Sequence, residues 1–192
     1  SRVTRGRRAQ LNYLGTDTPK QNISVSGLVN SSLYYGAAYS ADTGTDALGS
    51  GARDIAARGA VILPGGFVLG GYYETGAQGA NAFTRKMIDG LYEQGSLVVN
   101  AVYIMATDAG SAGNNNGYSL ECAYGLDKDN TVISTARYDA YQKVAADYSE
   151  LTGNLAYFLE ENVKVFAEYW MELAKPSGTL DSRLTAQVDI GL

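Results

Sequence analysis

The segment 22–40 carries apolar residues or glycine at its odd positions, on both sides of a polar break at 30–32. Serine, glycine and alanine fill most of its even positions. A period of two predicts β-strands with two unlike faces. The break has the length of a tight hairpin, and the phase of the alternation continues through it. The segment therefore predicts two antiparallel strands that share one apolar face.

The same alternation recurs along the whole chain and predicts about twelve strands. They are expected at about residues 8–14, 20–29, 32–40, 53–63, 67–74, 84–92, 96–107, 117–125, 129–141, 150–158, 163–171 and 181–192. Most have nearly the length with which a tilted strand crosses a bilayer, roughly 9–11 residues. No apolar run is long enough for a transmembrane helix. The segment 144–150 also lacks the apolar spacing of an amphipathic helix.

The predicted connections fall into two classes that alternate strictly along the chain. Short ones at 30–31, 64–66, 93–95, 126–129 and 159–162 hold the Asn, Asp, Gly and Pro of tight turns. Longer ones at 15–19, 41–52, 75–83, 108–116, 142–149 and 172–180 are polar and often glycine-rich. Short turns at one rim and longer loops at the other are typical of outer-membrane barrels, whose short turns are periplasmic. With an even number of strands, both termini are then expected in the periplasm.

Composition narrows the possible functions. The chain has 192 residues, enough for one domain over 1–192, and includes 15 tyrosines, a residue suited to membrane interfaces. It has no histidine, so a Ser-His-Asp arrangement is impossible and the commonest metal ligand is missing. Its single cysteine, Cys122, rules out an intrachain disulfide. We therefore expect neither an enzyme nor a cofactor.

The charge of the chain bears on its partners. A net charge of −5 argues against a nucleic-acid partner. The N-terminus is the exception because it carries Arg2, Arg5, Arg7 and Arg8. These arginines form either a solvated terminus or a contact for lipid headgroups, a partner protein or an anionic solute.

The two faces of each predicted strand differ in charge. In the last strand, Leu184 and Val188 share one face, and Arg183 and Asp189 share the other. An Arg or Lys pointing into lipid at the bilayer midplane costs roughly 2–4 kcal/mol. In a barrel the charged faces must therefore point inward. Arg53 and Lys86 fall on the apolar face, and both are expected near strand ends, where a long side chain reaches the interface.

The inward face supplies the candidate pore-lining residues. They are Asp54, Arg58, Arg85, Asp89, Asn100, Glu121, Arg137, Asp139, Lys164, Glu168, Arg183, Gln187 and Asp189. Charges of both signs cannot be buried dry without partners. They either line a water-filled lumen or pair into salt bridges that fill a narrow interior. The inward face of the hairpin at 22–40, with Ser24 and Ser26, is uncharged.

Several segments resemble Gram-negative porins of the phosphate-selective (O/P) type. In NISVSGLVNSSLYYGAAYS and RDIAARGAVILPGG, Arg58 and Pro64 match an inward arginine and a proline-containing turn of that family. ISTARYDAY holds an R-Y-D triplet at 137–139, and RLTAQVDIGL resembles a terminal porin strand. The resemblance implies a trimeric barrel of sixteen or more strands that passes solutes passively.

The chain departs from the family pattern in two ways. It supplies about twelve strands, which fits the C-terminal part of a larger barrel. It also ends in Leu192, where porins usually end in Phe. The basic ladder of the family has no clear counterpart, so phosphate selectivity is not carried over.

Together these patterns predict an all-β, antiparallel transmembrane β-barrel that closes alone or belongs to a 16- or 18-stranded barrel. The expected function is an outer-membrane porin that passes ions and small hydrophilic solutes. Its expected partners are outer-membrane lipid, those solutes and two further copies in a homotrimer. A structural barrel that holds a partner protein is the alternative. A soluble β-sandwich would show the same alternation, and loop asymmetry and strand number favour the barrel over it.

Overall fold

The computed structural model describes residues 21–41, 53–78, 81–108, 114–143, 146–160 and 163–190. The strand predicted at 8–14 lies outside these residues. The eleven strands are β1 (Gln21–Val29), β2 (Leu33–Ala41), β3 (Arg53–Leu63), β4 (Phe67–Gln78), β5 (Asn81–Gln94), β6 (Leu97–Asp108), β7 (Asn114–Gly125), β8 (Val132–Lys143), β9 (Ala146–Glu160), β10 (Val163–Ala174) and β11 (Ser182–Ile190). Each matches one of the remaining predicted strands. Among the described residues, no helix is long and apolar enough to cross a membrane.

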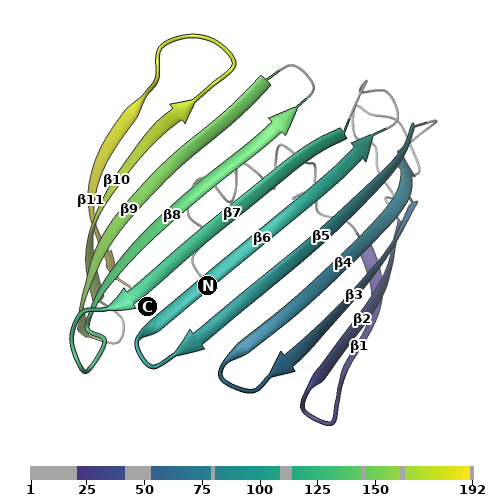
Figure 1. The fold of residues 1–192 in the computed structure, drawn as a ribbon, viewed down its shortest axis with the longest axis horizontal. Coiled ribbons are helices and arrows are strands. Elements are labelled where there is room, and N and C mark those ends of the chain that lie inside the picture. Colours follow the sequence, from purple (N-terminus) through teal and green to yellow (C-terminus); the bar gives the residue numbers. More distant parts are fainter. Residues whose placement is uncertain are drawn as a thin grey trace.

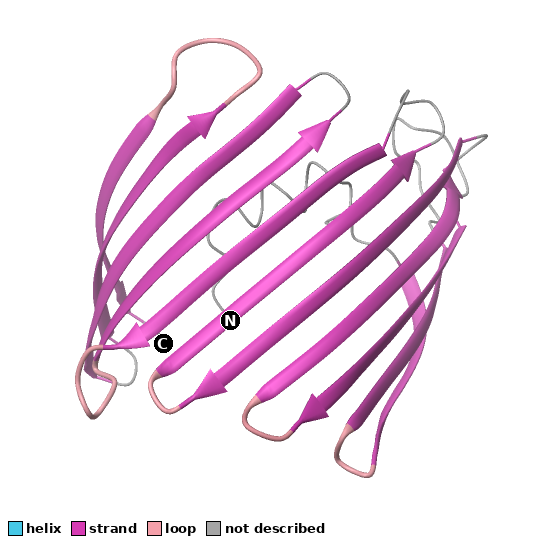
Figure 2. Ribbon diagram, in the orientation of Figure 1, coloured by secondary structure: helices cyan, strands magenta, loops and turns pink. Residues whose placement is uncertain are grey.

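The strands form one antiparallel sheet in which every strand pairs with its neighbours in the sequence. Figure 1 shows a strongly curved sheet with β11 at its left side and β1 at its right side. Figure 2 shows that loops alone join the strands in the described part of the chain. An up-and-down order of this kind is what a membrane barrel requires, because each backbone group pairs with the next strand. The all-β prediction is confirmed.

Two predicted loops are wrong. β4 continues to Gln78 and β5 begins at Asn81, so only 79–80 separates them, and only 144–145 separates β8 from β9. The predicted loops at 75–83 and 142–149 are therefore mostly strand. Pairs such as Thr75 opposite Thr84 extend the sheet where the outward residues are no longer apolar. Backbone hydrogen bonds between strands do not need apolar side chains. The strands therefore extend beyond the residues in which apolar and polar positions alternate.

The two rims of the sheet consequently differ less than predicted. We call the rim with connections 30–32, 64–66, 95–96, 126–131 and 161–162 the turn rim. The opposite loop rim has connections 42–52, 79–80, 109–113, 144–145 and 175–181. The longest connection, 42–52, is at the loop rim. Short and long connections nevertheless do not alternate strictly.

The predicted tight turns at 30–31 and 64–66 form in the structure. Asn30 and Ser31 have φ of 49° and 56°, and the amide of Ser32 donates to the carbonyl of Val29 at 3.1 Å. Two successive positive φ values give a type I′ turn, which matches the twist of paired strands. At the next turn Gly66 has φ of 83°, and a Cβ there would lie 1.9 Å from the carbonyl oxygen of Glu93. Only glycine fits that position.

Side chains alternate between an outward face and an inward face of the curved sheet. The outward face is apolar yet exposed, with Ile23 at 81% and Leu184 at 73%. The inward face holds the most buried polar groups, with Asp139 at 1% exposed. A water-soluble sandwich would instead bury its apolar face. This exposed apolar face therefore argues against the soluble β-sandwich.

β1 and β11 are the two edges of the sheet. Because each hairpin reverses direction, the first and eleventh strands run the same way. Direct pairing of these edges would thus be parallel, unlike every other pair in the sheet. Closing the sheet with antiparallel pairs alone requires an odd number of further strands.

Candidate functional site

The register of the sheet places all thirteen predicted pore-lining residues on the inward face. Three groups of them form ion pairs. One group lies on β3–β5, one on β7–β10 and one on β10–β11. The remaining four are Asp54, opposite Gly76, Asn100, opposite Glu121, Glu168, opposite Asn154, and Arg183, opposite Trp170. The alternation of the sequence predicts on which face each residue lies. Which of these residues form ion pairs depends on the register between neighbouring strands.

The first group joins β3 to β5 across a glycine of β4. Nη2 of Arg58 lies 2.6 Å from Oδ2 of Asp89. Gly70 lies between them, and a Cβ there would be 2.7 Å from Oδ1 of Asp89 and 3.0 Å from Nη2 of Arg58. The glycine therefore leaves the space that the ion pair occupies. A side chain at position 70 would have to displace it.

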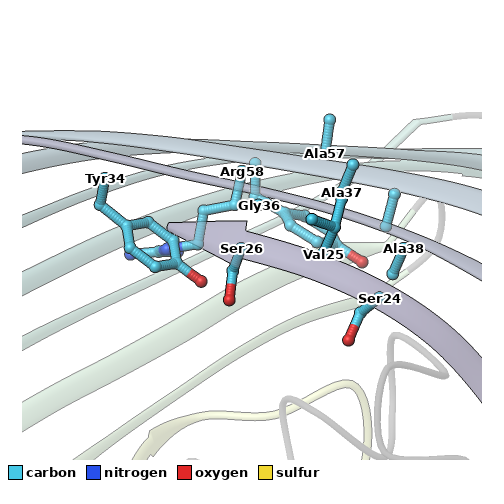
Figure 3. A pocket seen from close by; sticks show the side chains of 11 residues that line it. Ser24, Val25, Ser26, Tyr34, Gly36, Ala37, Ala38, Ala57 and Arg58 are labelled. Atoms are coloured by element: carbon cyan, nitrogen blue, oxygen red, sulfur yellow. The ribbon is translucent and has the colours of Figure 1, made fainter. Parts of the chain in front are cut away.

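Arg58 also lines a small pocket at the β1–β4 side of the sheet. The pocket has a volume of about 170 Å³ and includes Ser24, Ser26, Tyr34 and Tyr72. In Figure 3 the side chains of Ser24 and Ser26 point toward the side where the far strands lie, while Ala57 points away. The hairpin at 22–40 thus presents an uncharged hydroxyl surface to the interior, as predicted. Arg58 supplies the charge next to it.

A second ion pair in this group links β4 and β5. Nη1 of Arg85 lies 3.3 Å from both carboxylate oxygens of Glu74, and the hydroxyl of Tyr72 donates to Glu74 at 3.0 Å. The guanidinium of Arg85 also lies 4.4 Å from the ring centroid of Phe83. Arg85 and Glu74 are both buried. Glu74 was missed because it ends the predicted strand, although it continues the alternation of Gly70 and Tyr72.

The middle group surrounds Arg137 on β8, whose side chain is 2% exposed. Arg137 donates a hydrogen bond to Asp139. Its guanidinium also lies 4.0 Å from Glu121 and 3.8 Å from Glu150. The guanidinium of Arg137 is thus the shared ion-pair partner of three carboxylates. A buried charge is tolerated when it has such partners.

Glu150 in this group has neutral donors as well. Its Oε2 accepts hydrogen bonds from Nε1 of Trp170 at 2.8 Å and from the hydroxyl of Tyr148 at 2.6 Å. The ring of Tyr148 stacks on Tyr141 at 4.8 Å between centroids. Sequence reasoning missed Glu150 as a site residue, although the predicted strand 150–158 begins with it. Its register opposite Asp139 was the missing information.

The third group lies near the turn rim on β10 and β11. Nζ of Lys164 lies 2.6 Å from Oδ2 of Asp189, and Gln187 donates a hydrogen bond to the same carboxylate. Lys164 also lies 4.8 Å from the ring centroid of Phe166. Arg183, closer to the loop rim, is exposed and has no ion pair among the described residues.

Carboxylates dominate the inward face once the missed residues are included. The predicted set was nearly balanced in charge. Glu74, Glu150 and Glu172 add three acidic side chains, and of these Glu172 pairs with Lys175 at 2.8 Å. In the described part of the chain, no group of three or more acidic, Cys or His side chains is arranged to hold a metal ion. The arrangement is a polar wall with partly neutralised charges and an excess of acid.

Comparisons with known proteins find solved structures whose fold is similar to that of this chain. Neither protein-family models nor curated protein sequences match the chain. Among solved structures, OmpF of Salmonella typhi in complex with daunomycin is similar over 88% of this chain, with a TM-score of 0.73 and 12% identity. OmpT of Vibrio cholerae lacking loop L8 is similar over 98%, with a TM-score of 0.76 and 11% identity. An anion-selective porin from Comamonas acidovorans is similar over 88%, with a TM-score of 0.66 and 16% identity.

The chain spans 61%, 68% and 58% of the lengths of these three outer-membrane proteins. At such low identity the similarity concerns the fold alone. Three observations indicate the same fold. They are the up-and-down strand order, the exposed apolar outward face with its buried polar inward face, and the similarity to the three solved structures. The chain has the fold of the outer-membrane porins, an antiparallel transmembrane β-barrel of which eleven strands are described.

Proposed function

We propose that this chain forms the wall of a porin in the bacterial outer membrane, through which ions and small hydrophilic solutes diffuse passively. The observation that carries the proposal is the pairing of an exposed apolar outward face with a charged inward face. Lipid accepts the first, and a water-filled lumen suits the second. The porin fold of the similar structures supports the same conclusion.

The proposal includes closure of the sheet by an odd number of further antiparallel strands. Unpaired backbone groups at the edges of β1 and β11 would be costly in lipid. Five more strands would give sixteen and seven would give eighteen, the two barrel sizes that the family resemblance implies. The overlap with 61% of OmpF and 68% of OmpT supports a barrel larger than eleven strands. On this proposal residues 1–192 form part of that barrel, with the turn rim and both termini in the periplasm.

We propose a preference for cations, because acidic side chains outnumber basic ones on the inward face. Likeness to the phosphate-selective type rests on short motifs alone, and the acidic excess argues against selectivity for phosphate. The homotrimer is also a proposal drawn from the resemblance. The alternative role, a scaffold docking a partner, relied on Arg2, Arg5, Arg7 and Arg8, which lie outside the described residues.

Conductance in a planar bilayer tests the function directly. The protein purified from membranes should produce stepwise currents in potassium chloride. Under a salt gradient, the reversal potential should have the sign of a cation-selective pore. Glu121→Gln, at a partly exposed carboxylate, should reduce that potential without closing the channel. Absence of current from folded protein would contradict the porin, and an anion-selective potential would contradict the charge argument.

The chain's single cysteine gives an independent test of the membrane-facing surface. Cys122 lies on the outward face of β7, opposite Val99 and Ala136, and is exposed. In protein embedded in vesicles, a charged thiol reagent should modify it at least about tenfold more slowly than after unfolding, because thiolate and reagent both avoid lipid.

The matched control moves the thiol by one residue to the inward face. In the variant Cys122→Ala with Glu121→Cys, the charged reagent should react in the folded protein. An uncharged, membrane-permeant maleimide should label Cys122 in the folded wild type. Fast labelling of native Cys122 by the charged reagent would refute the outward assignment.

A further inference from the structure

Lys86 is the only cation among the outward-facing side chains that the structure describes. It was expected near the end of a strand, and this is wrong because β5 begins at Asn81, three residues earlier than predicted. The side chain is exposed on the apolar face, directly opposite Tyr73 of β4 and Met105 of β6. No described acidic group forms an ion pair with it. Within the described part of the chain, this cation therefore has no counter-charge.

Lys86 borders a hollow on the same face. The hollow is open on its outer side and has a volume of about 520 Å³. Its floor is made by Gly59 and Gly71, which lie directly opposite each other on β3 and β4. Its outward-facing walls are formed by Ala57, Tyr73, Lys86, Ile88 and Met105. A missing pair of side chains thus creates an apolar depression with one charged edge.

The sequence around Lys86 places it at the edge of the apolar band. Toward the loop rim, the next outward residues are Thr84 and, opposite it, Thr75. Toward the turn rim, they are Ile88 and Gly90. Tyr73 has an apolar ring and a polar tip, which suits the boundary between lipid tails and headgroups. From this level the lysine can extend its ammonium toward the headgroups.

We propose that Lys86 and this hollow form a binding site for a phosphorylated lipid of the leaflet at the loop rim. The lipid phosphate would contact the ammonium of Lys86, and one acyl chain would lie over Gly59 and Gly71 between Tyr73 and Ile88. The proposal rests on the membrane placement proposed above and goes beyond conduction. Loss of the lipid site would leave channel currents intact, so the two can fail separately.

Charge favours a lipid over a second copy of the chain as the occupant. Asp147, on β9, is the only acidic side chain that the structure describes on the outward face of the strands. A copy packed through the apolar part of that face would bury Lys86 without a counter-charge, which is costly. A phosphorylated headgroup supplies the counter-charge and its acyl chain fills the apolar hollow.

Native mass spectrometry of the membrane-extracted, delipidated protein tests the site. Phosphatidylglycerol and phosphatidylcholine with identical acyl chains serve as probes. The wild type should bind one phosphatidylglycerol more tightly than phosphatidylcholine. Lys86→Met should weaken phosphatidylglycerol binding about fivefold, the change in affinity expected when one lysine near an anionic lipid surface is removed. Lys86→Arg should restore the binding.

Filling the hollow gives a second, independent variant. A Cβ at Gly59 would meet no atom within 4 Å, so Gly59→Leu fits, and it should weaken binding about tenfold by excluding the acyl chain. Gly153→Leu is the matched control because Gly153 is equally open but lies on β9, away from the hollow. It should bind lipid as the wild type does.

Three outcomes would overturn the proposal. The first is equal affinity for the two lipids in the wild type. The second is unchanged phosphatidylglycerol binding in both Lys86→Met and Gly59→Leu. The third is a lower oligomeric mass in Gly59→Leu with lipid binding intact, which would identify the hollow as a contact between copies.

Discussion

Replacing Arg137 with methionine is expected to destabilise the folded protein by about 3–5 kcal/mol, the cost of breaking a buried ion pair by removing one partner. Arg137 is the one cation among Glu121, Asp139 and Glu150, and its side chain is 2% exposed. Methionine keeps much of the volume but leaves three carboxylates close together. They would have to bind protons or separate. The sheet at β7–β9 would loosen as a result.

The measurement is urea unfolding of the refolded protein in detergent micelles, followed by tryptophan fluorescence. Trp170 reports on this cluster because its indole donates to Glu150. Arg183→Met is the matched control, since Arg183 shares the inward face but is exposed without an ion pair to the described residues. It should change stability by less than about 1 kcal/mol.

A double variant separates lost charge balance from lost packing. Adding Asp139→Asn to Arg137→Met removes the carboxylate that Arg137 contacts most closely, so part of the lost stability should return. If Arg137→Met alone were as stable as the wild type, the cluster would not need its cation. The carboxylates would then be neutralised in some other way, and the proposed acidic lining of the pore would be weaker.

The alternation of the sequence predicted the sheet well because a lipid-facing surface constrains every second residue. All eleven described strands were expected, including β9, where a helix was the competitor. The strand ends at Gln78 and Asn81 were not predicted. There the outward residues become Thr75, Ala77, Ala82 and Thr84, so the apolar alternation ends while backbone pairing continues.

The face on which each candidate pore-lining residue lies was predicted from the sequence, but the contacts between these residues were not. Phase alone places Arg137 and Asp139 on the inward face. That Glu150 joins them depends on the register between β8 and β9, which local sequence does not encode. The hollow beside Lys86 likewise requires Gly59 and Gly71 to lie opposite each other on separate strands. Both features arise from pairing between strands rather than from a motif.

Two adjacent residues of β1 provide the sharpest test of the face assignment. Val25, at the centre of the strand, is 62% exposed on the outward face, and Ser26 lines the inward pocket with Tyr34 and Arg58. Val25→Lys should cost roughly 2–4 kcal/mol of stability in a bilayer, the cost of a lysine in lipid near the midplane. The fraction of protein folded into vesicles, read from the gel shift of unheated samples, measures this effect.

Ser26→Lys is the matched control, with the same new side chain one position away. Its ammonium would enter the polar interior, where the pocket offers space and water, so folding should remain close to that of the wild type. The two variants have the same charge, strand and neighbours in sequence, and they differ only in the face that receives the lysine. If Ser26→Lys blocked insertion and Val25→Lys did not, the apolar face would be the interior one, and the charged face could not be the wall of a pore.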